Sequence, residues 1–112
     1  MRTIGNLLAL NGRIYVYLPS TALVNLFFKN AEAEGFTFGA DRKPTESPHA
    51  DIIALNMDWT LNYVGYVGHL AFGMADEVGG KKLIRVDYGK YLAGRDDYIM
   101  TQKANTNDAK RP

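Results

Sequence analysis

The sequence predicts a single α+β domain in which one main helix packs on one face of a four- to five-stranded, mostly antiparallel sheet. Three observations lead to this fold class. Several short stretches alternate as strands do, one longer stretch has the end signals of a helix, and 46% of the 112 residues are apolar, enough for one modest core. We expect the domain to span residues 1–100, and we expect the polar residues 101–112 to form a disordered tail.

The N-terminal part begins with an ambiguous segment and continues with a clear strand. Residues 3–12 fit a short helix capped by Thr3, or one arm of a hairpin that turns at Asn11-Gly12. The helix is the preferred interpretation. Residues 13–18 alternate as a strand does, with two tyrosines on one face and three aliphatic residues on the other.

The main helix has both a start signal and a stop signal. Ser20 is a preferred N-cap residue and Gly35 is a preferred helix stop, which together predict a helix over residues 21–34. The first two turns of this helix are apolar nearly all round. We therefore expect them to be buried on more than one side, by the sheet and by a partner chain or a loop.

The second half of the chain predicts further strands around one polar loop. Residues 39–50 hold two prolines and five ionisable side chains, so we expect a loop outside the apolar core. Residues 51–56 and 59–67 are β-like and flank Met57-Asp58, which predicts a hairpin. The other expected elements are a strand at 36–38, a short helix or crossover at 68–75, a strand at 83–88 and a turn at 90–92.

Composition and charge exclude several classes of protein. The chain has no cysteine, so a disulfide scaffold, a thiolate metal site and a cysteine nucleophile are excluded. A net charge of +1 argues against a general nucleic-acid binder and against an acidic DNA mimic. The apolar runs are far shorter than a membrane span and no signal peptide is visible, so we expect a cytoplasmic protein without a membrane partner. We expect no catalytic residue, cofactor or metal.

Tyrosine and glycine gather between residues 59 and 98, and within this stretch residues 59–69 are the first candidate for a binding site. Trp59, Tyr63 and Tyr66 offer flat rings that suit stacking on a base or a sugar. Asn62 and His69 add hydrogen-bonding groups beside them. The alternative interpretation is a tyrosine-rich sheet face that packs against another subunit.

Two further segments are candidates for contacts with a phosphorylated ligand. Arg42, Lys43 and Thr45 lie in the polar loop and either close over a phosphate or stay solvated. Arg85 and Asp87 share one face of the last long strand. Arg85 suits a phosphate and Asp87 suits a ribose hydroxyl, whereas the alternative is a solvated face or a subunit interface with cross-strand ion pairs.

The two histidines are the candidates for acid–base chemistry. His49 and His69 have Asp51, Asp76 and Glu77 nearby in the sequence, which would allow a metal site or a general acid–base pair. Their spacing matches no metal-ligand or hydrolase motif. The alternative is that one is a loop histidine and the other a polar residue at a strand end.

Several segments of the chain together resemble small proteins carried by prophages and mobile elements of gut bacteria. The resemblance covers roughly residues 3–94 and contains no diagnostic active-site motif. The segments that carry it are LALNGRIYVY (8–17), AEAEGFTFG (31–39), DIIAL (51–55), NYVGYVGH (62–69) and IRVDYG (84–89).

The resemblance implies a phage-type protein that acts against host defence. Some such proteins are non-enzymatic sponges, which sequester cyclic nucleotide or cyclic ADP-ribose signals at subunit boundaries. We therefore expect a homo-oligomer that binds a small nucleotide-derived ligand in the bacterial cytoplasm. Two alternatives remain open: a protein–protein inhibitor of a defence system, of the anti-CRISPR kind, and a small histidine-dependent hydrolase or nuclease.

Overall fold

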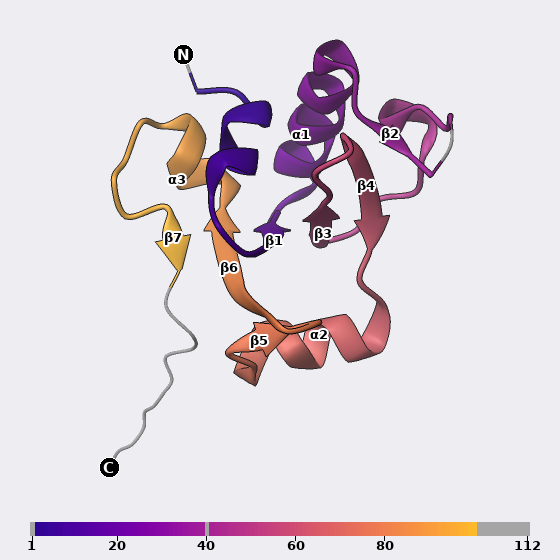
Figure 1. The fold of residues 1–112 in the computed structure, drawn as a ribbon. Coiled ribbons are helices and arrows are strands. Elements are labelled where there is room, and N and C mark those ends of the chain that lie inside the picture. Colours follow the sequence, from indigo (N-terminus) through magenta and orange to yellow (C-terminus); the bar gives the residue numbers. More distant parts are fainter. Residues whose placement is uncertain (1, 40, 101–112) are drawn as a thin grey trace.

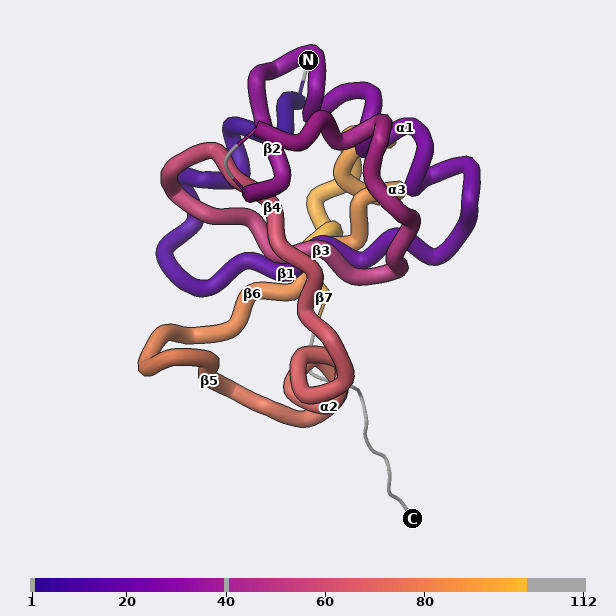
Figure 2. Tube along the Cα trace, turned by 90° about the vertical axis from the view of Figure 1, so that its right-hand side faces the viewer, coloured from indigo at the N-terminus to yellow at the C-terminus, as the bar shows by residue number. Residues whose placement is uncertain are grey.

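A computed structural model describes residues 2–39 and 41–100 of the chain. These residues form one α+β domain, in which a seven-stranded mixed sheet has helices on both faces (Figures 1 and 2). The predicted fold class is therefore confirmed. The tail predicted at residues 101–112 lies outside the described residues.

The helices and strands follow one another closely along the chain. The helical elements are the 3₁₀ helices η1 (Gly5–Ala9) and η2 (Pro44–Glu46) and the α-helices α1 (Thr21–Glu34), α2 (Gly65–Met74) and α3 (Tyr88–Leu92). The strands are β1 (Arg13–Tyr17), β2 (Thr37–Phe38), β3 (Ile52–Leu55), β4 (Thr60–Tyr63), β5 (Glu77–Val78), β6 (Lys81–Asp87) and β7 (Ile99–Met100).

The sheet has the order β2-β4-β3-β1-β6-β5, and β7 also pairs with β6. The β1–β6 and β2–β4 pairs are parallel, and the other four pairs are antiparallel, as the sequence mostly predicts. The five expected strands include β2, predicted over residues 36–38, and the two-residue strands β5 and β7 raise the number to seven. The sequence contains no alternation long enough to predict β5 and β7.

The two ends of β6 are covered by different strands on the edge that faces away from β1. Leu83 donates its backbone N–H to the carbonyl of Asp76, just before β5, over 2.9 Å. Asp87 donates its N–H to the carbonyl of Tyr98, just before β7, over 2.8 Å. Backbone N–H groups of residues two or four apart point to the same edge of a strand. The strands β5 and β7 therefore lie one after the other along this single edge of β6.

The larger core lies between the sheet and the layer formed by α1, α3 and η1. The side-chain oxygen of Ser20 accepts the N–H of Leu23, and Gly35 ends α1 with a φ of 100°, as predicted. Phe27 is fully buried and packs edge-on against the ring of Tyr88, with 5.0 Å between the ring centres. This face of the protein is therefore a dense aromatic and aliphatic core.

The helix α1 packs on the core through Val24 and Phe27, and the ring of Phe28 also meets His49 of the loop at 6.0 Å. Leu26 remains 40% exposed. The expectation that the first two turns are covered on a second side therefore holds at Phe28 and is wrong at Leu26. Whether a partner chain covers it stays a prediction.

The N-terminal segment is helical, which decides between the two interpretations of residues 3–12. It forms η1 rather than a hairpin arm, and the hydroxyl of Thr3 accepts the N–H of Asn6 over 3.1 Å. The carboxylate of Glu34 then accepts the N–H groups of Ile4 and Gly5 at 2.9 and 2.8 Å. These two bonds tie the start of the chain to the end of α1.

The strand predicted over residues 59–67 is wrong beyond Tyr63, because β4 ends there and α2 begins at Gly65. Gly65 has a φ of 68°, a left-handed conformation that glycine adopts at little cost and that turns the chain out of the sheet. The helix α2 crosses the face opposite α1, where the ring of Phe72 packs against Tyr17 at 5.7 Å. A thinner second apolar layer therefore covers this side of the sheet.

Candidate functional site

The predicted stacking residue Trp59 has a structural role in the hairpin between β3 and β4. Its φ of 66° places it in the left-handed region, which is uncommon for a residue with a side chain. Its ring packs on Phe36, with 4.6 Å between ring centres, and a Cβ at Gly5 would lie 2.6 Å from the ring. Trp59 thus holds the hairpin against the N-terminal segment.

Tyr63 and Asn62 on β4 are also engaged by neighbours within the chain. The ring of Tyr63 stacks on Phe38, with 4.8 Å between ring centres and 20° between ring planes, and its hydroxyl donates to the carbonyl of Pro48. Partial burial raises the pKa of the Tyr63 hydroxyl. The Asn62 side-chain oxygen accepts from the amide of Asn56.

Tyr66 and His69 lie on α2, not on the strand that carries Tyr63. Tyr66 points to solvent and is 78% exposed. His69 has both ring nitrogens engaged: Nδ1 lies 2.7 Å from the Gly65 carbonyl oxygen, and Nε2 lies 2.7 Å from Asp51 Oδ1. The Gly65 hydrogen bond first, and the Asp51 hydrogen bond next, raise the pKa of His69. A ring between two acceptors favours the doubly protonated form.

This arrangement bears on the predicted acid–base role of the histidines. A general base needs a free ring nitrogen within reach of the proton it removes. Both ring nitrogens of His69 already lie within hydrogen-bond distance of an oxygen of the chain, Nδ1 of the Gly65 carbonyl and Nε2 of Asp51 Oδ1, so neither is free. His49 lies elsewhere, with its ring edge-on to Phe28 at 6.0 Å. The described contacts therefore count against a histidine-dependent hydrolase centred on His69.

Arg85 on β6 is the predicted residue with the most unusual surroundings. It is only 5% exposed, and its Nε donates to the Phe72 carbonyl over 2.6 Å while Nη2 donates to the carbonyls of Ala71 and Ala75. These oxygens end α2, where the helix dipole favours a cation. Burial lowers the pKa of Arg85, an effect that the charge of Asp76 partly offsets.

The guanidinium of Arg85 keeps unused hydrogen-bonding capacity. Among residues 2–39 and 41–100, no carboxylate forms an ion pair with it, and its Nη1 donates to no group. A buried cation whose N–H groups are incompletely satisfied is costly unless water or a ligand reaches it. This nitrogen is thus a candidate contact for an acceptor that enters from outside.

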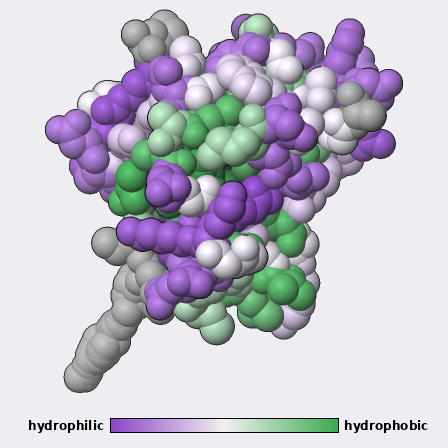
Figure 3. All heavy atoms as spheres, viewed as in Figure 1, coloured by the Kyte–Doolittle hydropathy of each residue, from purple (hydrophilic) through white to green (hydrophobic). Residues whose placement is uncertain are grey.

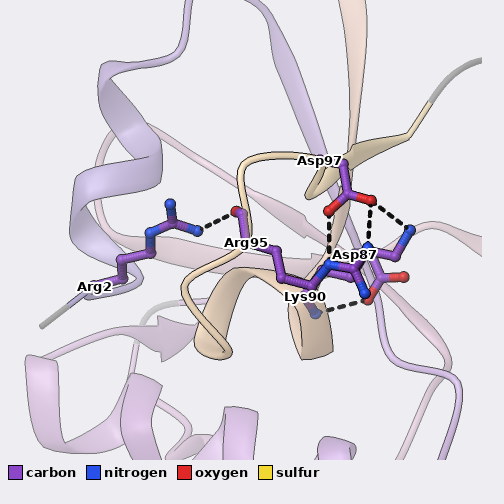
Figure 4. A network of polar contacts seen from close by, with 5 residues as sticks. All are labelled: Arg2, Asp87, Lys90, Arg95 and Asp97. Carbon is purple, nitrogen blue, oxygen red and sulfur yellow. Dashed lines mark hydrogen bonds and ion pairs between the residues drawn. The ribbon is translucent and has the colours of Figure 1, made fainter.

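Asp87 has a different role from the one predicted. Its carboxylate accepts the N–H of Lys90 over 3.2 Å and so caps the start of α3. Figure 4 shows it within a polar network in which Asp97 binds both Lys90 and Arg95. The positive charges of this network are matched by carboxylates, which argues against a phosphate site there.

The predicted lid loop lies beside α1 and also adjoins β4, where the charge of Arg42 acts on Tyr63. The backbone of Arg42 pairs with Phe38, and the Thr45 hydroxyl and N–H both donate to Oε1 of Glu32 in α1. These hydrogen bonds lower the pKa of Glu32. Arg42 and Lys43 are exposed. The loop is therefore fastened to α1, and the structure does not bring its cations to Arg85.

A cavity of about 650 Å³ lies at the outer edge of β6, between β5 and β7. Arg85 forms part of its wall and is the one candidate from the sequence that reaches it. The cavity combines both signs of charge with an apolar part. Its lining residues are Asp76, Glu77, Lys82, Leu83, Ile84, Arg85, Ile99 and Met100.

The sequence contains a weak signal for this cavity that reasoning by strand pattern missed. Acidic Asp76-Glu77 and basic Lys81-Lys82 flank the turn Gly79-Gly80, so charges of both signs meet at one hairpin. In the structure Glu77 and Lys82 face each other across β5 and β6. The contribution of β7 comes from a segment about fifteen residues farther along and is not visible locally.

The described part of the chain offers neither a metal site nor a membrane span. It contains no group of three or more His, Cys, Asp or Glu residues that are placed to hold a metal ion. None of its helices combines the length and the apolar character that crossing a bilayer requires.

Fold and cavity together define a single α+β domain with a mixed-charge cavity at one sheet edge. Comparison with protein-family models, with curated proteins and with solved structures found no match to this chain. The resemblance to prophage proteins therefore stays a prediction.

Proposed function

We propose that the protein binds, without catalysis, a small phosphate-bearing ligand of the nucleotide-derived kind in the cavity at the β6 edge. The observation that carries this proposal is the buried guanidinium of Arg85, which forms part of the cavity wall and has no ion-pair partner among the described residues. A phosphate or similar anion would accept from Nη1 and compensate the buried charge.

The rest of the cavity supports a ligand with more than a phosphate. Lys82 adds a second cation, while Asp76 and Glu77 suit the hydroxyl or amino donors of a sugar or base. Ile99 and Met100 offer an apolar surface for a ring. A volume of about 650 Å³ falls within the usual range for small-ligand sites, roughly 300–1,000 Å³.

The cellular role of such binding would be sequestration of a host immune signal in the bacterial cytoplasm. That role comes from the resemblance to phage proteins alone. Sequestration predicts that the ligand leaves the protein chemically unchanged, which separates it from the hydrolase alternative. The protein–protein inhibitor alternative draws support from the exposed apolar residues of α2, among them Tyr66 and Val67.

Titration calorimetry and thermal melting test the proposal with a fixed panel of probes: inorganic phosphate, AMP, cyclic mono- and dinucleotides and cyclic ADP-ribose. We expect at least one nucleotide to bind and to raise the melting temperature, because a ligand that binds only the folded state stabilises it. Heat denaturation should then release that nucleotide unaltered, as chromatography would show. Altered nucleotide would contradict the non-catalytic role, and no binding by any probe would overturn the proposal.

Adjacent lysines supply a matched pair of variants. Lys82 lines the cavity and Lys81 does not, although both are exposed residues at the start of β6. We expect Lys82→Ala to weaken nucleotide binding about tenfold, since a charge-assisted hydrogen bond is lost. Lys81→Ala should bind within about twofold of the unmodified chain. Equal affinities for the two variants would place the ligand elsewhere.

A further inference from the structure

The helix α2 exposes an apolar surface on the side that faces away from the sheet. Tyr66 and Val67 are 78% and 76% exposed, Leu70 is 43% exposed, and Gly73 lies on the same side. We call these four residues the α2 face. Hydrophobic residues gather over α2 in the surface view of Figure 3. A helix that is apolar on both sides is normally covered on both sides.

We propose that the α2 face packs against the α2 face of a second copy of this chain, with the two helices antiparallel around a twofold axis at Leu70. A twofold interface requires a surface that is complementary to itself. The shape and charge of α2 favour this dimer whether or not the proposed ligand binds.

The shape of the α2 face is self-complementary about Leu70. Val67 and Gly73 lie three residues before and three residues after Leu70, so an antiparallel copy sets Val67 against the partner's Gly73. A Cβ at Gly73 would meet nothing within 4 Å, so the fold of this chain does not require glycine there. Glycine weakens a helix relative to alanine, and the close approach of a second helix accounts for its use.

The charges at the two ends of α2 are complementary in the same arrangement. No side chain caps the N-terminus of α2, whose first N–H groups carry the positive end of the helix dipole. Asp76 and Glu77 follow the C-terminal end, and neither makes an ion pair among the described residues. In the antiparallel arrangement, the C-terminal end of each α2 lies beside the N-terminal end of the other, so the two carboxylates are on the side of the partner's positive helix end.

The exposed apolar residue of α1 does not form a comparable surface. Leu26 is 40% exposed, with the small Ala22 one turn before it and the polar residues Lys29 and Asn30 one turn after it. The α2 face has one ionisable neighbour on the helix, His69, which Asp51 already engages. The second copy is therefore placed on α2. The α2 face has only four residues, fewer than a standard protein–protein interface. We therefore expect a weak dimer, with a Kd of roughly tens of micromolar.

Sedimentation measurements over about 1 to 500 µM test the dimer with two variants matched in exposure. Leu70→Glu places a charge at the proposed axis, and Leu26→Glu makes the same change on α1. We expect Leu70→Glu to raise the dimer Kd at least tenfold, because two like charges meet at the axis. Leu26→Glu should leave the Kd unchanged, and circular dichroism checks that both variants fold.

Cysteine cross-linking tests the geometry, since the chain has no cysteine of its own. A residue on a twofold axis meets its own copy, so Leu70→Cys should form a disulfide-linked dimer under mild oxidation. Leu26→Cys should not. Lys82→Ala should dimerise normally, which separates this proposal from the ligand proposal. Two outcomes would overturn the proposed dimer. One is a chain that stays monomeric throughout, whether or not it binds another protein or lipid vesicles, and the other is a dimer that only the α1 variant disrupts.

Discussion

The two faces of the sheet differ in how their helices are held. The helix α1 has a serine cap at its start, a left-handed glycine after its end and fully buried aromatic side chains beneath it. The helix α2 has no side-chain cap, and its main sheet-facing ring, Phe72, is only partly buried. The side of the sheet that α1 covers therefore contributes most of the stability. The side that α2 covers has the exposed apolar residues and the end of the helix that adjoins Arg85.

The largest expected effect comes from removing one aromatic ring from each face of the sheet. Phe27→Ala should lower the free energy of unfolding by about 3–5 kcal/mol, since a fully buried ring leaves a cavity in a packed core. Phe72→Ala should lower it by only about 1–2 kcal/mol, because the ring is half-buried. Urea denaturation measures both values. Equal losses would mean that the two faces are equally important to folding.

Two glycines of α2 lie on different sides of the helix: Gly68 is buried and Gly73 is exposed. A Cβ at Gly68 would lie 2.3 Å from Cβ of Val64, so Gly68→Ala should destabilise the protein by about 1–3 kcal/mol. Gly73→Ala meets open space in the single chain and should stabilise the monomer by up to about 1 kcal/mol. Denaturation at low protein concentration measures both changes. Destabilisation by Gly73→Ala would contradict its exposed position.

The cap of α1 provides a smaller test. The side-chain oxygen of Ser20 accepts the N–H of Leu23 over 3.2 Å, so Ser20→Ala should cost about 1 kcal/mol of unfolding free energy. Thr21→Ala changes the neighbouring exposed residue and should cost less than about 0.5 kcal/mol. A comparison of the two midpoints in urea isolates the cap. No difference between them would show that the capping bond contributes nothing.

The smallest expected effect is the pH dependence from His69. Its folded-state pKa is raised by Gly65 and Asp51, so the stabilisation is fully present below the unfolded-state pKa of about 6.5 and is lost as the pH rises through the folded-state pKa. The pair is partly exposed, so we expect less than about 1 kcal/mol. The stability difference between the unmodified chain and His69→Gln should shrink from about pH 5.5 to about pH 8.5. A constant difference would rule out the linkage.

Several elements were predictable because their signals are local. Ser20 and Gly35 set the two ends of α1 through hydrogen bonds to residues no more than four positions away. The hairpin turns at the predicted Met57-Asp58. The failure over residues 59–67 is also instructive. Tyrosine and valine favour strands, but the left-handed conformation of Gly65 takes the chain out of the sheet and into a helix.

The candidate site was less predictable for a physical reason. The sequence offers ten candidate residues in three segments, and grouping them assumes that similar chemistry converges on one site. Instead, Trp59 and Tyr63 pack on neighbouring aromatic rings, Asp87 caps a helix and Thr45 binds Glu32. Arg85 alone reached the cavity. Side chains with good binding chemistry serve folding equally well, and a sequence does not distinguish the two uses.

The sequence by itself determined the α+β class, the capped helix, the longest strands and the absence of cysteine chemistry, because composition and short-range periodicity suffice for these. The tertiary structure alone decided that α2 covers the second face, that Arg85 is buried under its last turn, and that β5 and β7 leave a cavity along one edge of β6. Each of these depends on contacts between segments ten or more residues apart. Such contacts follow from packing the whole chain and leave no local pattern.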